Sequence, residues 1–317
     1  MNGKTLWVAA PSAKSYDSGV GYRNLPTTFP SVSITGAQCA LNCAHCGKQL
    51  LRGMLDVSQP GALSELIPRL RAAGAYGVLV SGGADLGGKV PLQERYAELQ
   101  QLKEAGFKVV VHTGLLRREE ARQLKAIGID QVLFDLIGDD VTIQNVYHLS
   151  HKAADYRRTL EDLCAEGLTV VPHVIVGLNF GSISSGELRA IEWAAESSVP
   201  GLVIVVLSPL PETMMARVSP PGAAEVAELL KAARERFADR SVMLGCARPA
   251  NAEKEDLERI AVDIGVDGIA YAAGNTIKYA ETKGYSVRFF PGCCSILAGN
   301  MVEKFLPKTV DKINLSS

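Results

Sequence analysis

The chain has 317 residues, 47% of them hydrophobic, and a formal net charge of −1 at pH 7. This length suits one large domain, or two smaller ones, with a sizeable core. The nearly neutral charge excludes an electrostatic footprint for nucleic acid or a membrane surface, and the sequence shows neither a long apolar run nor an export signal. Seven cysteines, an odd number, in a chain without such a signal predict a cytoplasmic protein whose thiols bind metal rather than form disulfides.

Strand-like and helix-like segments alternate from residue 31 onward, which predicts a parallel α/β architecture. Each strand-like segment is rich in Val, Ile and Leu, as expected where both faces of a sheet are buried. The predicted strands are 31–36, 77–81, 107–112, 131–136, 169–176, 202–207, 241–246 and 267–272. Helical stripes fill the gaps, such as 63–70 before Gly74 and 257–261 before Gly265, since glycine is a common residue just after a helix.

Eight strand–helix repeats predict a complete (β/α)8 barrel of the TIM type over residues 31–284. A partial barrel of six strands is the alternative, because sequence patterns predict elements better than they predict closure. Residues 1–30 have little periodicity and several prolines and glycines, so we expect an irregular lead-in. Residues 285–317 are expected to form a C-terminal tail.

Three cysteines follow the first predicted strand within one short loop, as Cys39, Cys43 and Cys46. Thiolates are soft ligands that favour iron–sulfur clusters or zinc. Three of them would hold three irons of a [4Fe–4S] cluster and leave the fourth iron open to a small molecule. Zinc with His45 as the fourth ligand is the alternative, but adjacent histidine and cysteine ligands are cramped and no second ligand pair at finger-like spacing follows. A cluster is therefore favoured.

Further reactive groups are expected where the strands end, because active sites of β/α barrels lie at that face. The second predicted strand is followed by Gly82 and Gly83, whose backbone can approach a ligand closely. An ordinary strand-to-helix turn is the alternative there. The fourth predicted strand ends near Asp135, which is either a ligand carboxylate or a helix N-cap.

The remaining cysteines suggest a second metal site. Cys246 follows the seventh predicted strand, and the pair Cys293–Cys294 lies in the tail, which can fold back over the barrel mouth. Three more thiols in one region predict an auxiliary cluster, with Ser295 or Arg248 as an unusual extra ligand. Buried free cysteine is the alternative, and we accept it for Cys164 on a helical stripe. Binding of one cluster by both adjacent cysteines would be geometrically tight.

The C-x3-C-x2-C spacing of the first loop resembles the signature of the radical S-adenosylmethionine (SAM) superfamily. The resemblance implies that the open iron chelates SAM and that the reduced cluster cleaves it to methionine and a 5′-deoxyadenosyl radical. Over about residues 5–300 the chain is similar to the biotin synthase-like branch. There, Gly82 and Gly83 correspond to a "GGE" motif that meets the SAM amino group, with the acid displaced here to Asp85.

The same resemblance implies other contacts with SAM. Asp135 corresponds to the carboxylate that binds the ribose hydroxyls, and the run containing Val176 and Gly177 corresponds to the segment that packs on adenine. His151 and Lys152 fall where the family places a basic side chain on the SAM carboxylate. A solvated helix face is the alternative for a single lysine.

Flanking segments 6–12 and 33–47 resemble the two-component lipoyl synthases, which act as pairs of related radical SAM subunits. This resemblance implies sulfur insertion into an octanoyl chain on a lysine of a lipoyl-carrier protein or peptide. It also implies a second lipoyl synthase subunit as partner, reduced ferredoxin or flavodoxin as electron donor, and a sulfide taken from an auxiliary [4Fe–4S] cluster. No cysteine precedes Cys39, unlike in single-chain lipoyl synthases, so the auxiliary ligands must come from Cys246 and the tail.

Three alternatives stay open beside a lipoyl synthase subunit. Biotin synthase would use a [2Fe–2S] sulfur donor, and a relative of the methylornithine synthase type would rearrange a carbon skeleton without any sulfur donor. The last alternative is an inactive barrel that binds a cluster and supports an active partner.

Overall fold

The computed structural model describes residues 4–300 and 302–305, and within them eleven parallel strands form one sheet. The strands are β1 Thr5–Ala9, β2 Ser31–Ser33, β3 Leu55–Asp56, β4 Gly77–Ser81, β5 Lys108–His112, β6 Gln131–Asp135, β7 Val170–Val176, β8 Gly201–Val206, β9 Ser241–Leu244, β10 Gly268–Ala270 and β11 Ser286–Phe290. Their order in the sheet is β11-β1-β10-β9-β8-β7-β6-β5-β4-β2-β3. Each of the eight predicted strands is present, so the prediction of a parallel α/β fold resembling a TIM barrel is confirmed.

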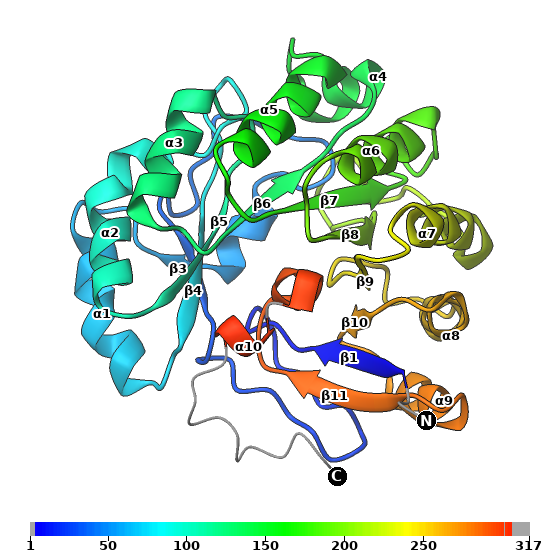
Figure 1. Ribbon diagram of the computed structural model, residues 1–317. Coiled ribbons are helices and arrows are strands. Elements are labelled where there is room, and N and C mark those ends of the chain that lie inside the picture. Colours follow the sequence, from blue (N-terminus) through cyan, green and yellow to red (C-terminus); the bar gives the residue numbers. More distant parts are fainter. Residues whose placement is uncertain (1–3, 301, 306–317) are drawn as a thin grey trace.

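Helices follow the strands and surround the sheet (Figure 1). The longer ones are α1 Ala62–Ala72, α2 Tyr96–Glu104, α3 Arg118–Ile127, α5 Ala153–Ala165, α6 Ser185–Glu196, α7 Ala223–Arg236, α8 Lys254–Ile264 and α9 Gly274–Thr282. The shorter ones are η1 Gln49–Gly53, η2 Leu92–Arg95, α4 Asp140–Thr142, η3 Ile143–Tyr147, η4 Cys294–Asn300 and α10 Val302–Phe305. Gly265 ends α8 with a φ of 88°, a left-handed conformation that glycine adopts without steric cost.

Two predicted boundaries are wrong. Residues 1–30 are not irregular throughout, because β1 lies between β10 and β11 in the sheet. The predicted tail likewise begins with a strand, β11, and its residues 301 and 306–317 lie outside the described residues. Neither strand is a continuous Val, Ile and Leu run, since β1 contains Thr5 and Trp7 and β11 contains Arg288, and such runs were the signal for the other strands.

Strand pairing does not close the barrel among the described residues, since the ladder ends at β11 and β3. Tyr76, just before β4, joins the two sides instead. Its N–H donates to the carbonyl of Thr28 (3.1 Å), and its hydroxyl donates to the carbonyl of Pro291 (3.2 Å), just after β11. The rings of Phe29 and Phe290 pack on it with centroids 5.2 and 6.4 Å away. Aromatic packing and loop hydrogen bonds therefore bridge this side of the barrel.

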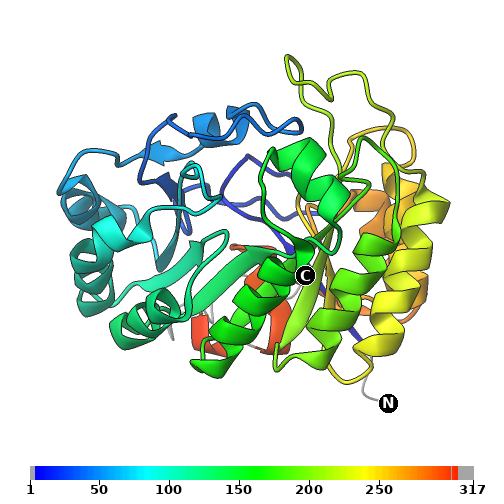
Figure 2. The same cartoon turned by 90° about the horizontal axis from the view of Figure 1, so that it is seen from above.

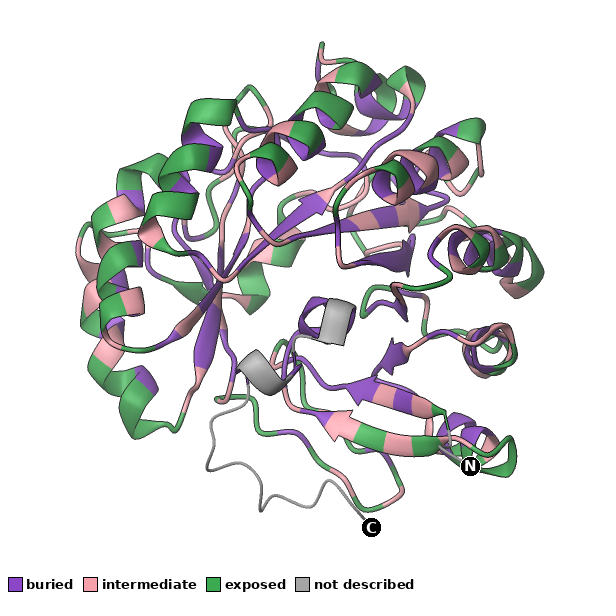
Figure 3. Ribbon diagram, in the orientation of Figure 1, coloured by how far each residue is buried: buried purple, intermediate pink, exposed green. Residues whose placement is uncertain are grey.

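The interior of the barrel is filled partly by the C-terminal segment. Ile296, Leu297 and Ala298 of η4 are buried in one cluster with strand residues such as Val203 and Met243, which we call the inner core. A separate outer core packs the other faces of the strands against the helices. Figure 1 shows η4 surrounded by the strands, and Figure 3 shows that buried residues line them.

The short helix η4, which fills part of the barrel interior, lies at the N-terminal end of the strands. Gly201, where β8 begins, is so close to Ala298 that an added Cβ would lie 3.0 Å from its methyl group. Gln131, where β6 begins, donates through Nε2 to the carbonyl of Ser295 (3.1 Å). Figure 2 shows the loops after β2 on one side of the barrel and η4 on the other. No helix in the described part of the chain is both long and apolar enough to cross a bilayer.

Candidate functional site

The loop with Cys39, Cys43 and Cys46 follows β2 and is held by two neighbouring loops. The N–H of Ala40 donates to the carbonyl of Ala84 after β4, and the N–H of Ala44 donates to the carbonyl of Val146 in η3, each at 2.8 Å. Backbone groups that would otherwise be unsatisfied thus fix the path of the loop. We call residues 39–46 the cysteine loop.

Sulfur and nitrogen donors converge inside the cysteine loop. The ligand atoms of Cys43, His45 and Cys46 all lie within 4.8 Å of one another, and Cys39 lies outside this group. A hydrogen bond from the Cys43 thiol, opposed by burial and helped by His45, lowers the pKa of Cys46 to about 4. The same hydrogen bond raises the pKa of Cys43. Such a site favours a bound thiolate, which fits a soft metal or an iron–sulfur cluster. His45 Nδ1 is buried and has no hydrogen-bond partner among the described residues, so the zinc alternative also fits the position of this histidine.

Gly83 lies against the cysteine loop, and Gly82 lies against Ile34 and Thr35, shortly before that loop. A Cβ at Gly83 would come within 1.9 Å of the Gln38 carbonyl oxygen and 2.6 Å of the Cys39 Cα. The N–H of Gly83 donates to Thr35 Oγ1 at 2.6 Å, so it is not available to SAM. The amino group of SAM is a hydrogen-bond donor, and the backbone carbonyls of this segment are acceptors of the kind it needs. Glycine is therefore required at position 83 for the cysteine loop to pack, and its predicted contact with SAM stays a prediction.

Two of the side chains considered for SAM make local contacts. Asp85 Oδ1 accepts hydrogen bonds from the N–H groups of Gly87 (2.9 Å) and Lys89 (3.0 Å), so it builds a turn. Lys152 is 66% exposed and its Nζ lies 3.4 Å from Asp140 Oδ2. These contacts match the solvated-surface alternative for Lys152, and its role on the SAM carboxylate stays a prediction.

Val176 ends β7, and Gly177 is the residue after it. The Val176 side chain is fully buried in the outer core, so only its backbone can face a ligand in the barrel. Gly177 has a φ of 75°, and a Cβ there would lie 2.3 Å from Pro221 Cγ. Its N–H donates to Glu187 Oε1 at 3.2 Å. Packing thus explains this glycine, and contact of the run with adenine stays a prediction.

His112, Asp135 and His173 form what we call the polar trio on the inner face of β5, β6 and β7. His112 Nε2 lies 3.4 Å from Asp135 Oδ1, and the two imidazole rings are 6.0 Å apart. Burial would raise the pKa of Asp135, but the His112 imidazole outweighs it and lowers that pKa to about 2. Burial would lower the pKa of His112, but Asp135 outweighs it in turn and raises that pKa. The N-cap alternative for Asp135 is wrong, because Asp139 caps α4 by accepting from the N–H of Thr142 (2.9 Å).

His173 gives the fold a specific sensitivity to acid. Burial lowers its pKa from 6.5 to about 4, so between these values the unfolded chain binds more protons than the folded one. The free energy of unfolding is therefore largest above pH 6.5 and falls as the pH drops towards 4. When the pH is lowered from 7 to 5, we expect the free energy of unfolding of His173→Gln to fall by about 2 kcal/mol less than that of wild type. Urea unfolding of the metal-free proteins measures this difference. His148→Gln is the control at an exposed position; equal losses in wild type and His173→Gln would contradict this account.

The other three cysteines that the sequence singled out come together in the barrel. The Cys294 thiol shares hydrogen bonds with Cys246 after β9 and with its neighbour Cys293. Ser295 donates through Oγ to Cys293 Sγ at 3.1 Å. The hydrogen bond from Cys294 lowers the pKa of Cys293 to about 6 and also lowers that of Cys246, while the pKa of Cys294 rises. We call Cys246, Cys293 and Cys294 the second thiol group; its role as a cluster site stays a prediction.

Arg248 is not free to act as an extra ligand. Its guanidinium is buried, pairs with the fully buried carboxylate of Glu258, and donates to the carbonyl of Gly245 at 2.6 Å. Ser295 is already hydrogen-bonded to the thiol of Cys293. The contacts of Arg248 thus fix the segment that follows Cys246, and the hydrogen bond from Ser295 fixes the segment that follows Cys293.

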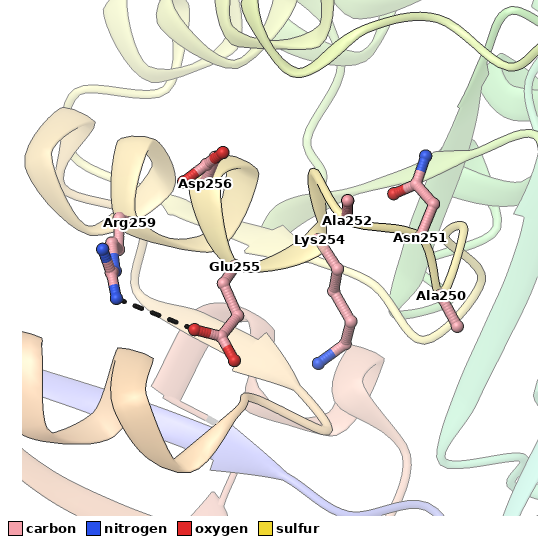
Figure 4. Close-up of a pocket in the computed structure, with 7 residues that line it drawn as sticks. All are labelled: Ala250, Asn251, Ala252, Lys254, Glu255, Asp256 and Arg259. Carbon is pink, nitrogen blue, oxygen red and sulfur yellow. Dashed lines mark ion pairs between the residues drawn. The ribbon is translucent and has the colours of Figure 1, made fainter.

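A surface pocket of about 400 Å³ opens where α8 begins. Figure 4 shows side chains of both charges around it, and no cysteine is among the residues that line it, which are Ala250, Asn251, Ala252, Lys254, Glu255, Asp256 and Arg259. The thiol groups, rather than this pocket, therefore mark the candidate reactive centre.

Comparisons with known proteins agree with this geometry. Residues 33–184, which include the cysteine loop, match the family model of the Radical SAM superfamily. A biotin synthase of Aromatoleum aromaticum is 27% identical over 251 residues, covering 76% of this chain and 74% of that protein.

Solved structures share the fold at low sequence identity. The [FeFe]-hydrogenase maturase HydG superposes with a TM-score of 0.61 at 14% identity, covering 90% of this chain and 64% of that chain, so this chain spans less than two thirds of it. Methylornithine synthase (PylB) gives a TM-score of 0.54 at 12% identity, covering 78% and 72%. Residues 33–184, with their loop of three cysteines, are thus similar to the radical SAM superfamily.

Proposed function

We propose that this protein inserts sulfur into an unactivated carbon chain, as a lipoyl synthase subunit that converts octanoyl-lysine to lipoyl-lysine. The observation that carries the proposal is the second thiol group, Cys246, Cys293 and Cys294, gathered in the same barrel as the cysteine loop. A radical enzyme that only rearranges carbon has no use for a second set of metal-binding thiols. A sulfur-inserting enzyme needs a donor of sulfide near the reacting carbon.

Cys39, Cys43 and Cys46 would hold the first [4Fe–4S] cluster, which when bound and reduced supplies the cleavage of SAM to a 5′-deoxyadenosyl radical. The donor set fits, since Cys46 favours the thiolate form and the loop is fixed by Ala84 and Val146. Apolar strand residues around the barrel exclude water, which protects a reactive radical from side reactions.

The second thiol group would hold the auxiliary [4Fe–4S] cluster that donates sulfide. This proposal carries with it an octanoylated lipoyl-carrier protein or peptide as substrate and a second radical SAM subunit as partner. Reduced ferredoxin or flavodoxin is the proposed electron donor. Similarity to the two-component lipoyl synthases in segments 6–12 and 33–47 supports this choice.

Biotin synthase is the second candidate, favoured by the 27% identity to the Aromatoleum aromaticum protein. The two functions differ in cluster type, because biotin synthase uses a [2Fe–2S] sulfur donor. Mössbauer spectra of the reconstituted protein distinguish them, and cleavage of SAM excludes an inactive scaffold.

Cys246→Ala tests the proposal. We expect the variant, reconstituted without oxygen, to cleave SAM at a rate within about twofold of wild type, because the cysteine loop is unchanged. It should form no sulfur-containing product from an octanoyl-lysine peptide assayed with the partner subunit. Both 5′-deoxyadenosine and thiolated peptide are measured by mass spectrometry.

Cys164→Ala is the matched control, since Cys164 lies on α5 and packs against the outer core, and it belongs to neither thiol group. It should retain both activities. Loss of SAM cleavage in Cys246→Ala would place Cys246 in the first reaction, and unchanged sulfur insertion would remove the second thiol group from the chemistry.

A further inference from the structure

We propose that His112 is the protein nitrogen ligand that completes the second cluster site, beside Cys246, Cys293 and Cys294, and that Asp135 orients it. This inference rests on the proposed function, because it requires a cluster at the second thiol group. Three thiolates leave one iron of a cubane cluster without a protein ligand, and histidine replaces cysteine at iron in other iron–sulfur proteins.

The position of His112 follows from the alternation of side chains along β5. Val110 belongs to the inner core together with Cys293 and Cys294. Side chains two residues apart point to the same face of a strand. His112 therefore projects into the same interior space, nearer the C-terminal end of the strand.

The neighbouring strand β6 contacts both the segment that carries Cys293 and the histidine. Gln131 at its start donates to the carbonyl of Ser295 (3.1 Å), and Ser295 donates to the Cys293 thiol (3.1 Å). Asp135 at its end, on the same inner face, lies 3.4 Å from His112. One strand thus fixes both the tail that carries Cys293 and the carboxylate that contacts His112.

The contact with Asp135 leaves the correct nitrogen free. Nε2 is the ring nitrogen beside the carboxylate, 3.4 Å from Asp135 Oδ1. In the tautomer with its proton on Nε2, Nδ1 keeps a lone pair for a metal, as in carboxylate–histidine–metal sites. His112 lies close enough to interact electrostatically with Cys293 and Cys246 as well as with Asp135.

The other candidate ligands are less suitable. His173 Nδ1 lies 3.2 Å from the carbonyl of Val171, so this nitrogen already contacts an acceptor. The Arg248 guanidinium has no acceptor lone pair at neutral pH and is held by Glu258. Among the described side chains around the second thiol group, His112 combines a free lone pair with a supporting carboxylate.

The test uses the full-length chain with Cys39, Cys43 and Cys46 all replaced by alanine, so that only the second site can hold iron. The protein is labelled with ¹⁵N-histidine, reconstituted and reduced, and nitrogen hyperfine coupling is measured by pulsed electron paramagnetic resonance. Iron and sulfide are measured on the same samples, with about four iron atoms per chain expected. The same measurements are made after His112→Ala, His112→Cys and, as a matched control, His173→Ala.

We expect strong ¹⁵N coupling in the parent and in His173→Ala, and its loss in both His112 variants. His112→Cys supplies a thiolate, so it should keep its iron and sulfide, which separates loss of the ligand from loss of the fold. An intact cluster without histidine coupling in the parent would overturn the role of His112 and leave the proposed function standing. A parent that binds no cluster, in a chain whose unfolding transition is normal, would overturn both.

Discussion

Gly83→Ala is expected to prevent assembly of the first cluster and to lower SAM cleavage by at least two orders of magnitude. The added methyl group would lie 1.9 Å from the carbonyl oxygen of Gln38 and 2.6 Å from the Cys39 Cα. Both obstacles are backbone, so no side-chain rotation relieves them, and the cysteine loop must move. A displacement of about 1 Å at a reacting site costs about 100-fold in rate, and here the displaced residue is itself a predicted cluster ligand.

Gly53→Ala is the matched control, because a Cβ there meets no atom within 4 Å and the residue ends η1, just beyond the cysteine loop. Iron per chain, sulfide per chain and 5′-deoxyadenosine formation are measured for both variants. Full iron content and normal SAM cleavage in Gly83→Ala would show that the loop tolerates displacement, and the steric account of Gly83 would then be wrong.

The strands and the meeting of the thiols could be predicted because both follow from simple regularities. Continuous Val, Ile and Leu runs such as 202–207 mark strands buried on both faces. Carboxyl ends of parallel strands meet at one edge of the sheet, which brings the residue after β9, Cys246, near groups at the ends of other strands. Cys293 and Cys294 lie in a tail that can fold back towards the barrel, and the structure brings Cys294 to Cys246.

What could not be predicted depends on contacts between distant segments. The hydrogen bond from the Gly83 N–H to Thr35 Oγ1 depends on how the loops pack and not on any sequence motif. His112 and His173 each fall two residues after an inward-facing valine, and this alternation was the available signal for the polar trio. It does not reveal that His112 pairs with Asp135, because the pairing depends on the register of β5 and β6.

The buried ion pair between Arg248 and Glu258 links the stability of the fold to the second thiol group. Glu258 is fully buried and accepts hydrogen bonds from the N–H of Ala273 (2.8 Å) and the hydroxyl of Thr276 (2.7 Å) as well as from Arg248. Arg248 lies two residues after Cys246, so the pair anchors the loop that carries this thiol to α8. Removing the charge of Glu258 leaves a buried guanidinium unpaired.

We expect Glu258→Gln to lower the free energy of unfolding of the metal-free protein by about 3–5 kcal/mol, the usual cost of breaking a buried pair from one side. Against a typical total of about 5–15 kcal/mol this is a large fraction. The freed loop should also reduce iron at the second site while the cysteine loop still cleaves SAM. Urea unfolding gives the first quantity, and iron content beside 5′-deoxyadenosine formation gives the second.

Two comparisons make this prediction specific. Asp239→Asn removes an acid that is 89% exposed and lies 3.8 Å from Arg240, so stability should change by less than about 0.5 kcal/mol. The double variant Arg248→Met with Glu258→Gln removes the unpaired guanidinium and keeps an acceptor for Ala273 and Thr276, so it should recover most of the lost stability. If Glu258→Gln is as stable as wild type, the pair does not anchor the Cys246 loop. If stability falls but iron at the second site is unchanged, the loop keeps its geometry without the pair, and the second thiol group is held by the tail alone.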